Sequence, residues 1–444
     1  MNDFDVIERK MESVGLSQAA IGAFRHSVNV LTSQQSMMIP EAEIAPADDV
    51  ADWESLTAST PEADAELLGQ AVLIKLNGGL GTGMGLQKAK SLLEIKPGVT
   101  FLDLIVRQVM SLRRRAGCPV SLLLMNSFST SADTMAYLSR YADEGFADPQ
   151  QVEMIQNRVP KLCVDTLEPV SFPAHPELEW CPPGHGDLYP ALLGSGWLDR
   201  LLEAGVKYAF VSNSDNLGAQ LDTRFLRWFA ESGAPFVMEV TRRTEADKKG
   251  GHLAMRRSDG QPLLREVAQC PEEDLAAFQD INKHRYFNTN NLWVRLDALR
   301  DFLKANGGVV PLPVIRNVKT VDPRDASTQK VYQLETAMGA AIQCFPGARA
   351  VCVPRSRFFP VKTCSDLLLL RSDAVVIRED GGMELAPECG GVAPVVLLNA
   401  KFYKLVDSLD GLGVPSLKHA RRLVVNGPHH FADGEPICGE VVID

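Results

Sequence analysis

From Ala71 onward, short apolar runs alternate with stretches that have helical spacing. Four runs of five or six mostly apolar residues predict strands at Ala71 to Leu76, Val120 to Met125, Tyr208 to Ser212 and Phe236 to Val240. Between the first two runs, residues 101–116 place several apolar side chains on one helical face, and Gly117 can end that helix. Alternation of strand and helix is typical of a doubly wound sheet with mostly parallel strands. The sequence therefore predicts an α/β fold.

The two ends of the chain have different patterns. Apolar residues at roughly helical spacing between residues 5 and 31 predict one or two helices that dock onto a larger body, followed by an acidic, proline-rich connector on the surface. After about Pro387 the apolar pieces become short and are separated by Gly, Pro and Asn, which favours a small all-β tail. We therefore expect N-terminal helices and a connector over 1–65, a central domain over 66–384 and a C-terminal domain over 385–444.

An asparagine lies at the end of each of the first three predicted strands. These residues are Asn77, Asn126 and Asn213. Ligands of open parallel sheets bind outside the carboxyl ends of the strands. We expect the three asparagines to face one crevice.

Charge and cysteine content narrow the class of protein. The 444 residues carry a net charge of −11, which disfavours a nucleic-acid partner, because binding to the phosphate backbone needs a basic face. The nine cysteines are scattered without a C-x-x-C pair, which favours a reducing compartment over disulfides or a zinc site. No run of eighteen uncharged apolar residues and no apolar leader occurs. We expect a cytoplasmic protein without a membrane span.

The stretch "LNGGLGTGMGLQKAKS", residues 76–91, has five glycines in eight positions directly after a predicted strand. Glycine backbones can approach phosphate or base atoms closely, and the loop ends in Lys88 and Lys90. It is not a Walker loop, because the chain contains no Gly-Lys pair, and Met84 stands where G-x-G-x-x-G needs its third glycine. A flexible surface turn is the alternative interpretation.

Four further segments carry residues suited to chemistry. His185 in "PPGHGDLYPAL" suits an acid, a base, an anion donor or a plain loop histidine. Asp215 in "VSNSDNLG" suits a Mg²⁺ ion shared with substrate phosphates, and equally an Asx turn. The amides of "FNTNNLWV" suit a polyhydroxylated ligand, and "VPRSRFFPVKTCSD" supplies three cations in a segment that its prolines and phenylalanines favour as a held loop.

Other enzyme classes lack their usual motifs. The chain has no H-E-x-x-H, no G-x-S-x-G and no cluster of cysteine and histidine ligands. Metalloprotease, serine hydrolase and zinc-site interpretations therefore lose their support.

Taken in order, the motifs resemble those of the eukaryotic-type UTP–glucose-1-phosphate uridylyltransferase (UDP-glucose pyrophosphorylase) family. The resemblance runs from about Leu73 to Leu370 and more weakly beyond. It rests on "LNGGLGTGMG", "KS" with "TFLDLIVRQ", "MNSFST", "PPGHGDLYPAL", "VSNSDNLGAQLD", "FNTNNLW", "QLETAMGAAI" and "VPRSRFFPVKTCSDLLLL". It implies an α/β, Rossmann-like nucleotidyltransferase domain with a mixed, mostly parallel sheet, plus a small C-terminal left-handed β-helix domain.

The resemblance also implies roles for individual residues. Nucleotide binding falls to Leu76, Asn77, Gly78, Gly79, Lys90, Gln156, Gly184 and Asn213. Sugar-phosphate binding falls to His185, Asp215, Asn288 and Asn290. Asp215 also matches the magnesium position, and Lys90 and Lys362 match the lysines that neutralise charge on the reacting phosphates.

This chain departs from the family pattern at three places. The usual "KGPKS" is "QKAKS" here, so Gln87 and Ala89 replace a lysine and a proline. The usual "FNQS" is "MIQN", which keeps Gln156 and changes its neighbours. The β-helix is expected to be short, ending at "GEVVID", and the resemblance leaves the oligomeric state open.

The implied reaction joins UTP and glucose 1-phosphate to give UDP-glucose and pyrophosphate, with Mg²⁺ as cofactor. A broad UDP-sugar or UDP-N-acetylhexosamine pyrophosphorylase and a non-catalytic nucleotide-sugar-binding protein remain alternatives. A dinucleotide dehydrogenase is the weakest alternative, because the glycine fingerprint fails at its third position.

Overall fold

The computed structural model describes residues 4–33, 37–56 and 61–444. The described chain has an α/β fold with a mixed, mostly parallel central sheet, as the sequence predicts. It divides into two compact units, each made of three chain segments. The first unit consists of Met1–Ile74, Met154–Val211 and Thr223–Val353, and the second of Lys75–Glu153, Ser212–Asp222 and Pro354–Asp444.

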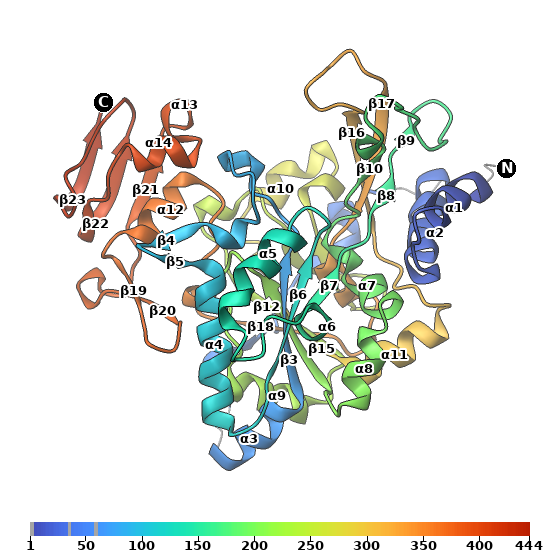
Figure 1. Cartoon of the computed structure of the whole chain (residues 1–444), viewed down its shortest axis with the longest axis horizontal. Helices are drawn as coiled ribbons and strands as arrows, with labels where there is room; N and C mark the ends of the chain where they lie inside the picture. The colour runs from blue at the N-terminus through green and yellow to red at the C-terminus, as the bar shows by residue number, and fades with distance from the viewer. Residues whose placement is uncertain (1–3, 34–36, 57–60) are drawn as a thin grey trace. The chain divides into compact units, whose positions relative to one another are not determined.

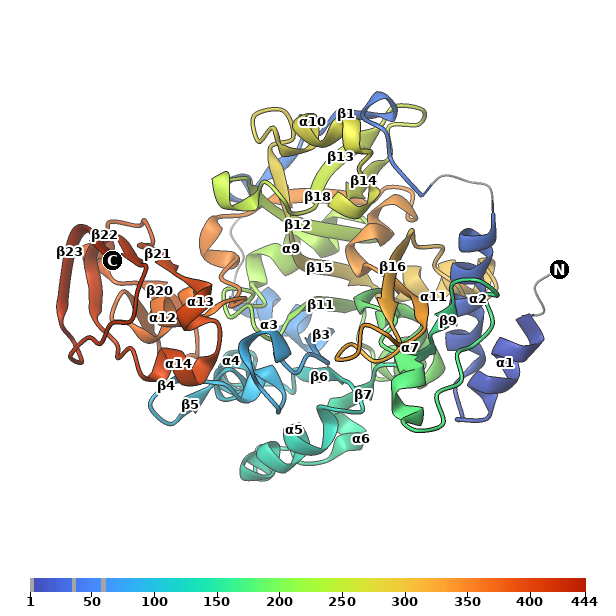
Figure 2. The same cartoon turned by 90° about the horizontal axis from the view of Figure 1, so that it is seen from above.

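In the sheet of the first unit, one long strand, β15 (Tyr286–Arg295), has partner strands on both sides. The strands of this sheet follow the order β2-β18-β12-β15-β11-β3. β15 pairs antiparallel with both β11 and β12, whereas β12 and β18 are parallel (Figure 2). The bounds of the others are β2 (Ala51–Asp52), β3 (Ala71–Asn77), β11 (Tyr208–Asn213), β12 (Phe236–Arg242) and β18 (Arg349–Cys352).

The four predicted strands all form, as part of β3, β6 (Ser121–Asn126), β11 and β12. The remaining strands of the first unit are β1 (Ile44–Pro46), β8 (Val159–Pro160), β9 (Leu162–Cys163), β10 (Trp180–Cys181), β13 (His252–Arg256), β14 (Pro262–Arg265), β16 (Val314–Thr320) and β17 (Lys330–Thr336). Its helices are α1 (Phe4–Glu12), α2 (Gln18–Thr32), α3 (Pro61–Gly69), α7 (Leu188–Gly194), α8 (Trp197–Glu203), α9 (Thr223–Ser232), α10 (Leu275–Gln279) and α11 (Leu296–Ala305).

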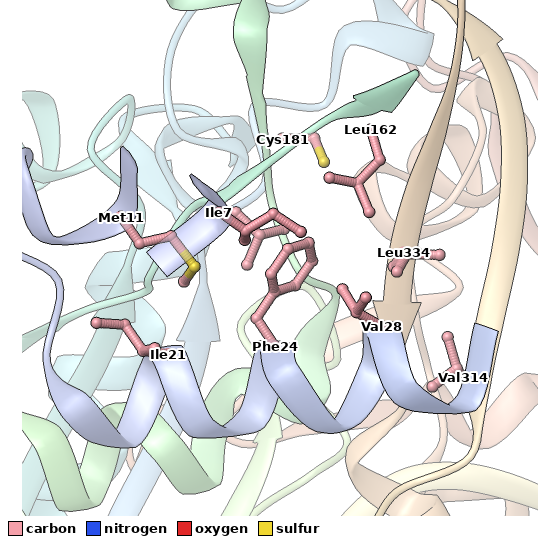
Figure 3. Close-up of a cluster of buried hydrophobic side chains, with 10 residues drawn as sticks. Ile7, Met11, Ile21, Phe24, Val28, Leu162, Cys181, Val314 and Leu334 are labelled. Atoms are coloured by element: carbon pink, nitrogen blue, oxygen red, sulfur yellow. The ribbon is translucent and has the colours of Figure 1, made fainter. Parts of the chain in front are cut away.

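The two N-terminal helices dock onto the first unit, as their pattern predicts. Ile7 of α1 and Phe24 and Val28 of α2 are buried in one apolar cluster with Leu162 and Leu334 (Figure 3). Ser17 is the N-cap of α2, and its hydroxyl accepts a hydrogen bond from the backbone N–H of Ala20. Burial of this stripe, rather than helix propensity, holds the helices in place.

The connector is more than the surface segment that its composition predicts. Its strand β1 pairs antiparallel with β13, and Ile44 is buried. Glu41 receives a hydrogen bond at 2.6 Å from Arg265, whose side chain is fully buried, and lies 2.9 Å from Nε2 of His284. These partners lie more than two hundred residues away in sequence, so local composition could not reveal them. Residues 57–60 of the connector lie outside the described residues.

The second unit begins where β3 leaves the first. The strand order continues from β3 to β6 and then to β7 (Glu153–Ile155), the strand in which the chain returns to the first unit. The predicted helix forms as α4 (Phe101–Ala116), with a capping box between Thr100 and Asp103 and a left-handed Gly117 at its end. The other helices of this unit are α5 (Ser131–Leu138), α6 (Pro149–Val152), α12 (Cys364–Arg371), α13 (Ala400–Tyr403) and α14 (Val406–Asp410).

The C-terminal segment contains the predicted strands, but the expectation of an all-β tail is wrong, because the short helices α13 and α14 lie between two of these strands. β21 (Val395–Leu398), β22 (Ser416–Val425) and β23 (Pro436–Ile443) form a parallel three-stranded sheet, orange to red in Figure 1. Two short hairpins complete the strands of this unit: β4 (Glu94–Lys96) with β5 (Val99–Thr100), and β19 (Val375–Ile377) with β20 (Met383–Leu385). The predicted domain boundaries at residues 65 and 384 stay a prediction.

Within the described residues, none of the helices is both long enough and apolar enough to cross a membrane.

Phe24→Ala removes the largest of the buried side chains in the N-terminal cluster. We expect the free energy of unfolding to fall by about 3–5 kcal/mol, because a buried aromatic ring is replaced by a cavity. Val6→Ala in α1, where the side chain is 38% exposed, is the control and should change the free energy by less than about 0.5 kcal/mol. Urea unfolding measures both, and equal losses would contradict the packing described.

Candidate functional site

The glycine loop after β3 contains two kinds of glycine. Gly81 and Gly85 have φ of 67° and 81°, a left-handed conformation that side chains disfavour. A Cβ added at Gly79 or Gly83 would meet no atom within 4 Å. The loop folds back on itself, because the N–H of Lys90 donates to the carbonyl of Gly79 at 3.0 Å. The first pair shapes the loop, and the second pair leaves its backbone open to a ligand.

The asparagines at the strand ends differ in burial and in hydrogen-bond partners. Asn77 and Asn126 are buried, and Nδ2 of Asn77 donates to Oδ1 of Asn126 at 2.7 Å. Asn126 in turn donates to Glu153 at 2.6 Å. Asn213 is half-buried at the end of β11. The amides of Asn77 and Asn126 satisfy each other only in part, because Oδ1 of Asn77 has no hydrogen-bond partner among the described residues. That the three asparagines face one crevice stays a prediction. The backbone around Asn77 remains the part suited to a ligand.

Three distant segments meet at Lys90 in the second unit. Its Nζ donates to Oδ2 of Asp215 at 2.6 Å and to the carbonyl of Val361. The side chains of Lys90 and Asp215 are 16% and 19% exposed, so the ion pair is largely withdrawn from water. Lys362 follows Val361 with an exposed side chain, and its N–H donates to Asp366 at 2.9 Å at the start of α12. The structure thus brings Lys90 and Asp215 together and holds the backbone of Lys362 beside them.

Asp215 is a lone carboxylate rather than part of a protein-built metal cage. Among the described residues, no group of three or more His, Cys, Asp or Glu side chains could hold a metal ion. Mg²⁺ is often held by only one or two carboxylates, and substrate phosphates and water complete its shell. The hard oxygen donors of Asp215 fit that ion.

In the first unit, β17 backs the loop that carries His185 and dictates its glycines. Gly184 has φ of 80°, and a Cβ there would lie 2.5 Å from the carbonyl oxygen of Thr336. A Cβ on Gly186 would lie 2.3 Å from Oγ1 of the same threonine. Neither position tolerates a side chain, so the Gly-His-Gly order follows from the close approach of this strand.

His185 is held as a neutral hydrogen-bond donor. Its Nδ1 accepts the N–H of Met338 at 3.0 Å, which leaves the ring proton on Nε2. Burial lowers the pKa of His185 to about 4. The sequence left an acid, a base and an anion donor open, and this geometry favours the donor.

Gln156 and Asn157 are fixed against the same loop. Nε2 of Gln156 donates to the carbonyl of Gly184 at 3.1 Å, so its Oε1 is left as the acceptor for a ligand. The backbone N–H and the side-chain amide of Asn157 donate to Asp187 at 2.6 and 3.0 Å. Burial raises the pKa of Asp187 to about 7, and the hydrogen bonds from Asn157 offset part of that rise.

The asparagines of "FNTNNLWV" lie on β15 and divide into two roles. Asn291 is fully buried, and its amide and the indole of Trp293 donate to buried Glu239 at 3.0 and 2.9 Å. Asn290 has φ of 58°, beside a β-bulge in the pairing with β12, and is only half-buried. Nδ2 of Asn288 donates to Oδ1 of Asn290 at 2.9 Å. The bulge redirects this amide pair out of the regular pleat.

The predicted site residues divide between the two units. The second unit holds Leu76, Asn77, Gly78, Gly79, Lys90, Asn213, Asp215 and Lys362, and the first holds Gln156, Gly184, His185, Asn288 and Asn290. Sequence reasoning missed Asn157 and Asp187, although the carboxylate two residues after His185 was the available signal. The assignment of the predicted site residues to individual substrates stays a prediction.

Asp187→Asn tests the buried carboxylate through the pH dependence of stability. Between about pH 4 and pH 7, folded wild-type protein keeps a proton on Asp187 that the unfolded chain has released. The free energy of unfolding therefore falls with rising pH because of Asp187, and asparagine removes that slope. The variant should gain on wild type by up to about 4 kcal/mol across this window.

The opposite slope from His185, whose folded pKa is about 4, is present in both proteins and cancels in the difference. Urea unfolding at a series of pH values measures the difference between variant and wild type. A difference that stays constant with pH would contradict the raised pKa of Asp187.

Comparison with known proteins agrees with the sequence resemblance. The sequence profile of the UTP–glucose-1-phosphate uridylyltransferase family matches residues 21–435. The UTP–glucose-1-phosphate uridylyltransferase of Saccharomyces cerevisiae is 45% identical over 399 residues, covering 89% of this chain and 78% of that one. The enzyme of the same name from Solanum tuberosum is 39% identical, covering 93% and 83%.

Solved structures agree across almost the whole chain. A mutant UDP-glucose pyrophosphorylase from Leishmania major, crystallised with UDP-glucose, has a TM-score of 0.93 and 47% identity, covering 99% of this chain and 94% of that chain. A structure described as UDP-glucose phosphorylase from Trypanosoma brucei has a TM-score of 0.89 and 44% identity, covering 99% of both chains. The chain belongs to the UTP–glucose-1-phosphate uridylyltransferase family of nucleotidyltransferases.

Proposed function

We propose that this protein makes UDP-glucose and pyrophosphate from UTP and glucose 1-phosphate. The observation that carries the proposal is the meeting of Lys90 and Asp215, with Lys362 one residue beyond the Val361 carbonyl that Lys90 also contacts. Cations and a carboxylate so arranged suit phosphoryl chemistry, in which several negative charges must be brought together. Membership of the uridylyltransferase family supports the same reaction.

UTP would be held by backbone and amide groups. The open glycines of the loop after Leu76 suit contact between main chain and nucleotide. Gln156 offers Oε1, since its Nε2 is bound to Gly184. An acceptor there pairs with the N3–H of uracil and is repelled by the unprotonated N3 of cytosine.

Glucose 1-phosphate would be held by donors that carry no charge. His185 presents Nε2–H, because its Nδ1 is occupied by the N–H of Met338. Asn288 and Asn290 supply amide groups from the bulged strand. Neutral donors bind a phosphate oxygen and sugar hydroxyls without taking a proton from the nucleophile.

The reaction needs positioning and charge neutralisation rather than a covalent enzyme intermediate. A phosphate oxygen of glucose 1-phosphate forms a bond to the α-phosphorus of UTP, and the bond to the leaving pyrophosphate breaks with its electron pair on pyrophosphate. Lys90 and Lys362 offset the charge that develops on the phosphates. Asp215 would hold Mg²⁺, which when bound neutralises phosphate oxygens and helps to orient them.

We also infer a short left-handed β-helix at the C-terminus and a cytoplasmic location. Parallel pairing of β21 with β22 and of β22 with β23 supports successive turns of one coil. Each of the nine cysteines is a free thiol, which supports a reducing compartment.

Pyrophosphate release from UTP tests the proposed function. With Mg²⁺, we expect release with glucose 1-phosphate to exceed release with galactose or N-acetylglucosamine 1-phosphate, because the function is proposed for the glucose ester. EDTA and Asp215→Ala should each suppress it. A flat sugar profile would favour the broad-specificity alternative, and UTP binding without any release would favour the non-catalytic one.

Lys362→Ala should lower kcat by about 100-fold or more while the affinity for UTP changes much less. The reason is that a charge aimed at the transferring phosphates acts mainly in the transition state. Steady-state kinetics and calorimetric titration of UTP measure the two quantities. Lys401→Ala, an exposed lysine on α13, is the control. An unchanged kcat in Lys362→Ala would remove this residue from the mechanism.

A further inference from the structure

Two segments of the second unit each carry a residue of the proposed reaction. Residues 212–222 carry Asp215, and residues 354–363 carry Lys362. About 140 residues separate them in sequence, yet a displacement of about 1 Å between reacting groups can cost about 100-fold in rate. The attachment between the two segments is therefore a candidate determinant of turnover.

Asn216 joins the segments with both ends of its amide. Its Nδ2 donates to the carbonyl of Arg357 at 3.2 Å, and its Oδ1 accepts the N–H of Phe359 at 2.8 Å. The side chain is buried, so water does not compete for these bonds. The amide takes the place of a neighbouring strand for this stretch of backbone.

Backbone contacts on either side of Asn216 continue the pairing. Asn216 and Pro360 form an isolated antiparallel bridge. The N–H of Val361 donates to the carbonyl of Asp215 at 3.2 Å. The pairing thus runs from Arg357 to the residue directly before Lys362.

Gly218 sets how closely the segments approach. A Cβ at this position would lie 2.4 Å from the carbonyl oxygen of Ser356 and 2.9 Å from the carbonyl carbon of Arg357. Both atoms belong to backbone, which cannot rotate away as a flexible side chain can. The guanidinium of buried Arg357 donates to the carbonyl of Gln220 at 2.9 Å and closes the contact from the other side.

We propose that Asn216 is a positioning residue that, with the close contact at Gly218, fixes Lys362 relative to Asp215 and thereby sets turnover. The proposal rests on the proposed function, because it concerns the reacting groups of that reaction. In this proposal Asn216 contacts neither phosphate nor sugar. It acts by holding the backbone segment that carries Lys362.

The test compares Asn216→Ala and Gly218→Ala with wild type, using UTP, glucose 1-phosphate and Mg²⁺. The first substitution removes the attachment, and the second pushes the segments apart. Each should lower kcat by about 10 to 100-fold, while the KM for UTP stays within about threefold, because the glycine loop is unchanged. The kcat values are referred to the concentration of UTP-binding sites, measured by calorimetric titration.

Asn399→Ala is the matched control. Exposed Asn399 also uses both ends of its amide: Nδ2 donates to the carbonyl of Asn426 in another segment at 2.9 Å, and Oδ1 accepts the N–H of Lys401 at the start of α13 at 3.0 Å. It lies between β21 and α13, and its loss should leave kcat unchanged. A fall in kcat equal to that of Asn216→Ala would mean that any such link matters, and would overturn the proposal.

A double-mutant cycle separates positioning from a general loss of structure. In a Lys362→Ala background, Asn216→Ala and Gly218→Ala should each lower kcat by less than about twofold, because the group they position is already absent. A general defect would lower kcat by the same factor in both backgrounds and would overturn the proposal. Loss of UTP binding in both single variants would overturn it as well.

Wild-type activity distinguishes this inference from the proposed function. Without pyrophosphate release by wild-type protein, the proposed function itself fails. Wild-type release together with an unchanged kcat in Asn216→Ala overturns the positioning role alone.

Discussion

The buried ammonium group of Lys75 is the point on which the arrangement of the second unit depends. Lys75 is 1% exposed near the end of β3, and its Nζ donates to Oγ of Ser212 and to the carbonyl of Ala219, both at 2.8 Å. A buried charge is costly unless its donors are satisfied, so the chain after β11 must wrap around this group. The loop that carries Asp215 is consequently attached to the strand that leads into the glycine loop.

The loop that carries His185 in the first unit handles charge in the opposite way, by suppressing it. Burial favours the neutral forms of both His185 and Asp187, which lie in one loop beside Gln156 and Asn157. In its neutral form, His185 accepts a hydrogen bond at Nδ1 and can donate one from Nε2. Around Lys90 the second unit offers a largely buried ion pair, whereas this loop of the first unit offers oriented dipoles.

The sequence was sufficient for elements whose pattern is local. The strands β3, β6, β11 and β12 and the helix α4 follow from apolar runs, helical spacing and the stop at Gly117. Only the resemblance placed Lys90 and Asp215 in the same predicted site, because the two residues are 125 positions apart in sequence. Long-range pairing such as that of Glu41 with Arg265 leaves no local trace at all.

Side-chain direction was the other limit of sequence reasoning. Asn288, Asn290 and Asn291 are chemically alike, and the bulge beside β12 decides which of them faces the core. In the same way, the sequence does not show that Asn77 and Asn126 are buried and that Nδ2 of Asn77 donates to Oδ1 of Asn126. A segment rich in amides predicts hydrogen bonding, but the backbone geometry decides whether the partner is another protein group or a ligand.

Glycine content alone conceals two distinct constraints in this chain. A Cβ at Gly79 or Gly83 would enter open space, so the fold gives no reason for the absence of a side chain there. A Cβ at Gly184 or Gly218 would strike backbone oxygen at 2.5 or 2.4 Å, so the fold itself demands glycine. Substitution of a glycine of the first kind is expected to affect ligand binding with little change in stability, and substitution of one of the second kind is expected to disturb the local fold. In the glycine-rich loop, the positions that point to ligand binding are therefore Gly79 and Gly83, where an added Cβ would meet no atom of the protein.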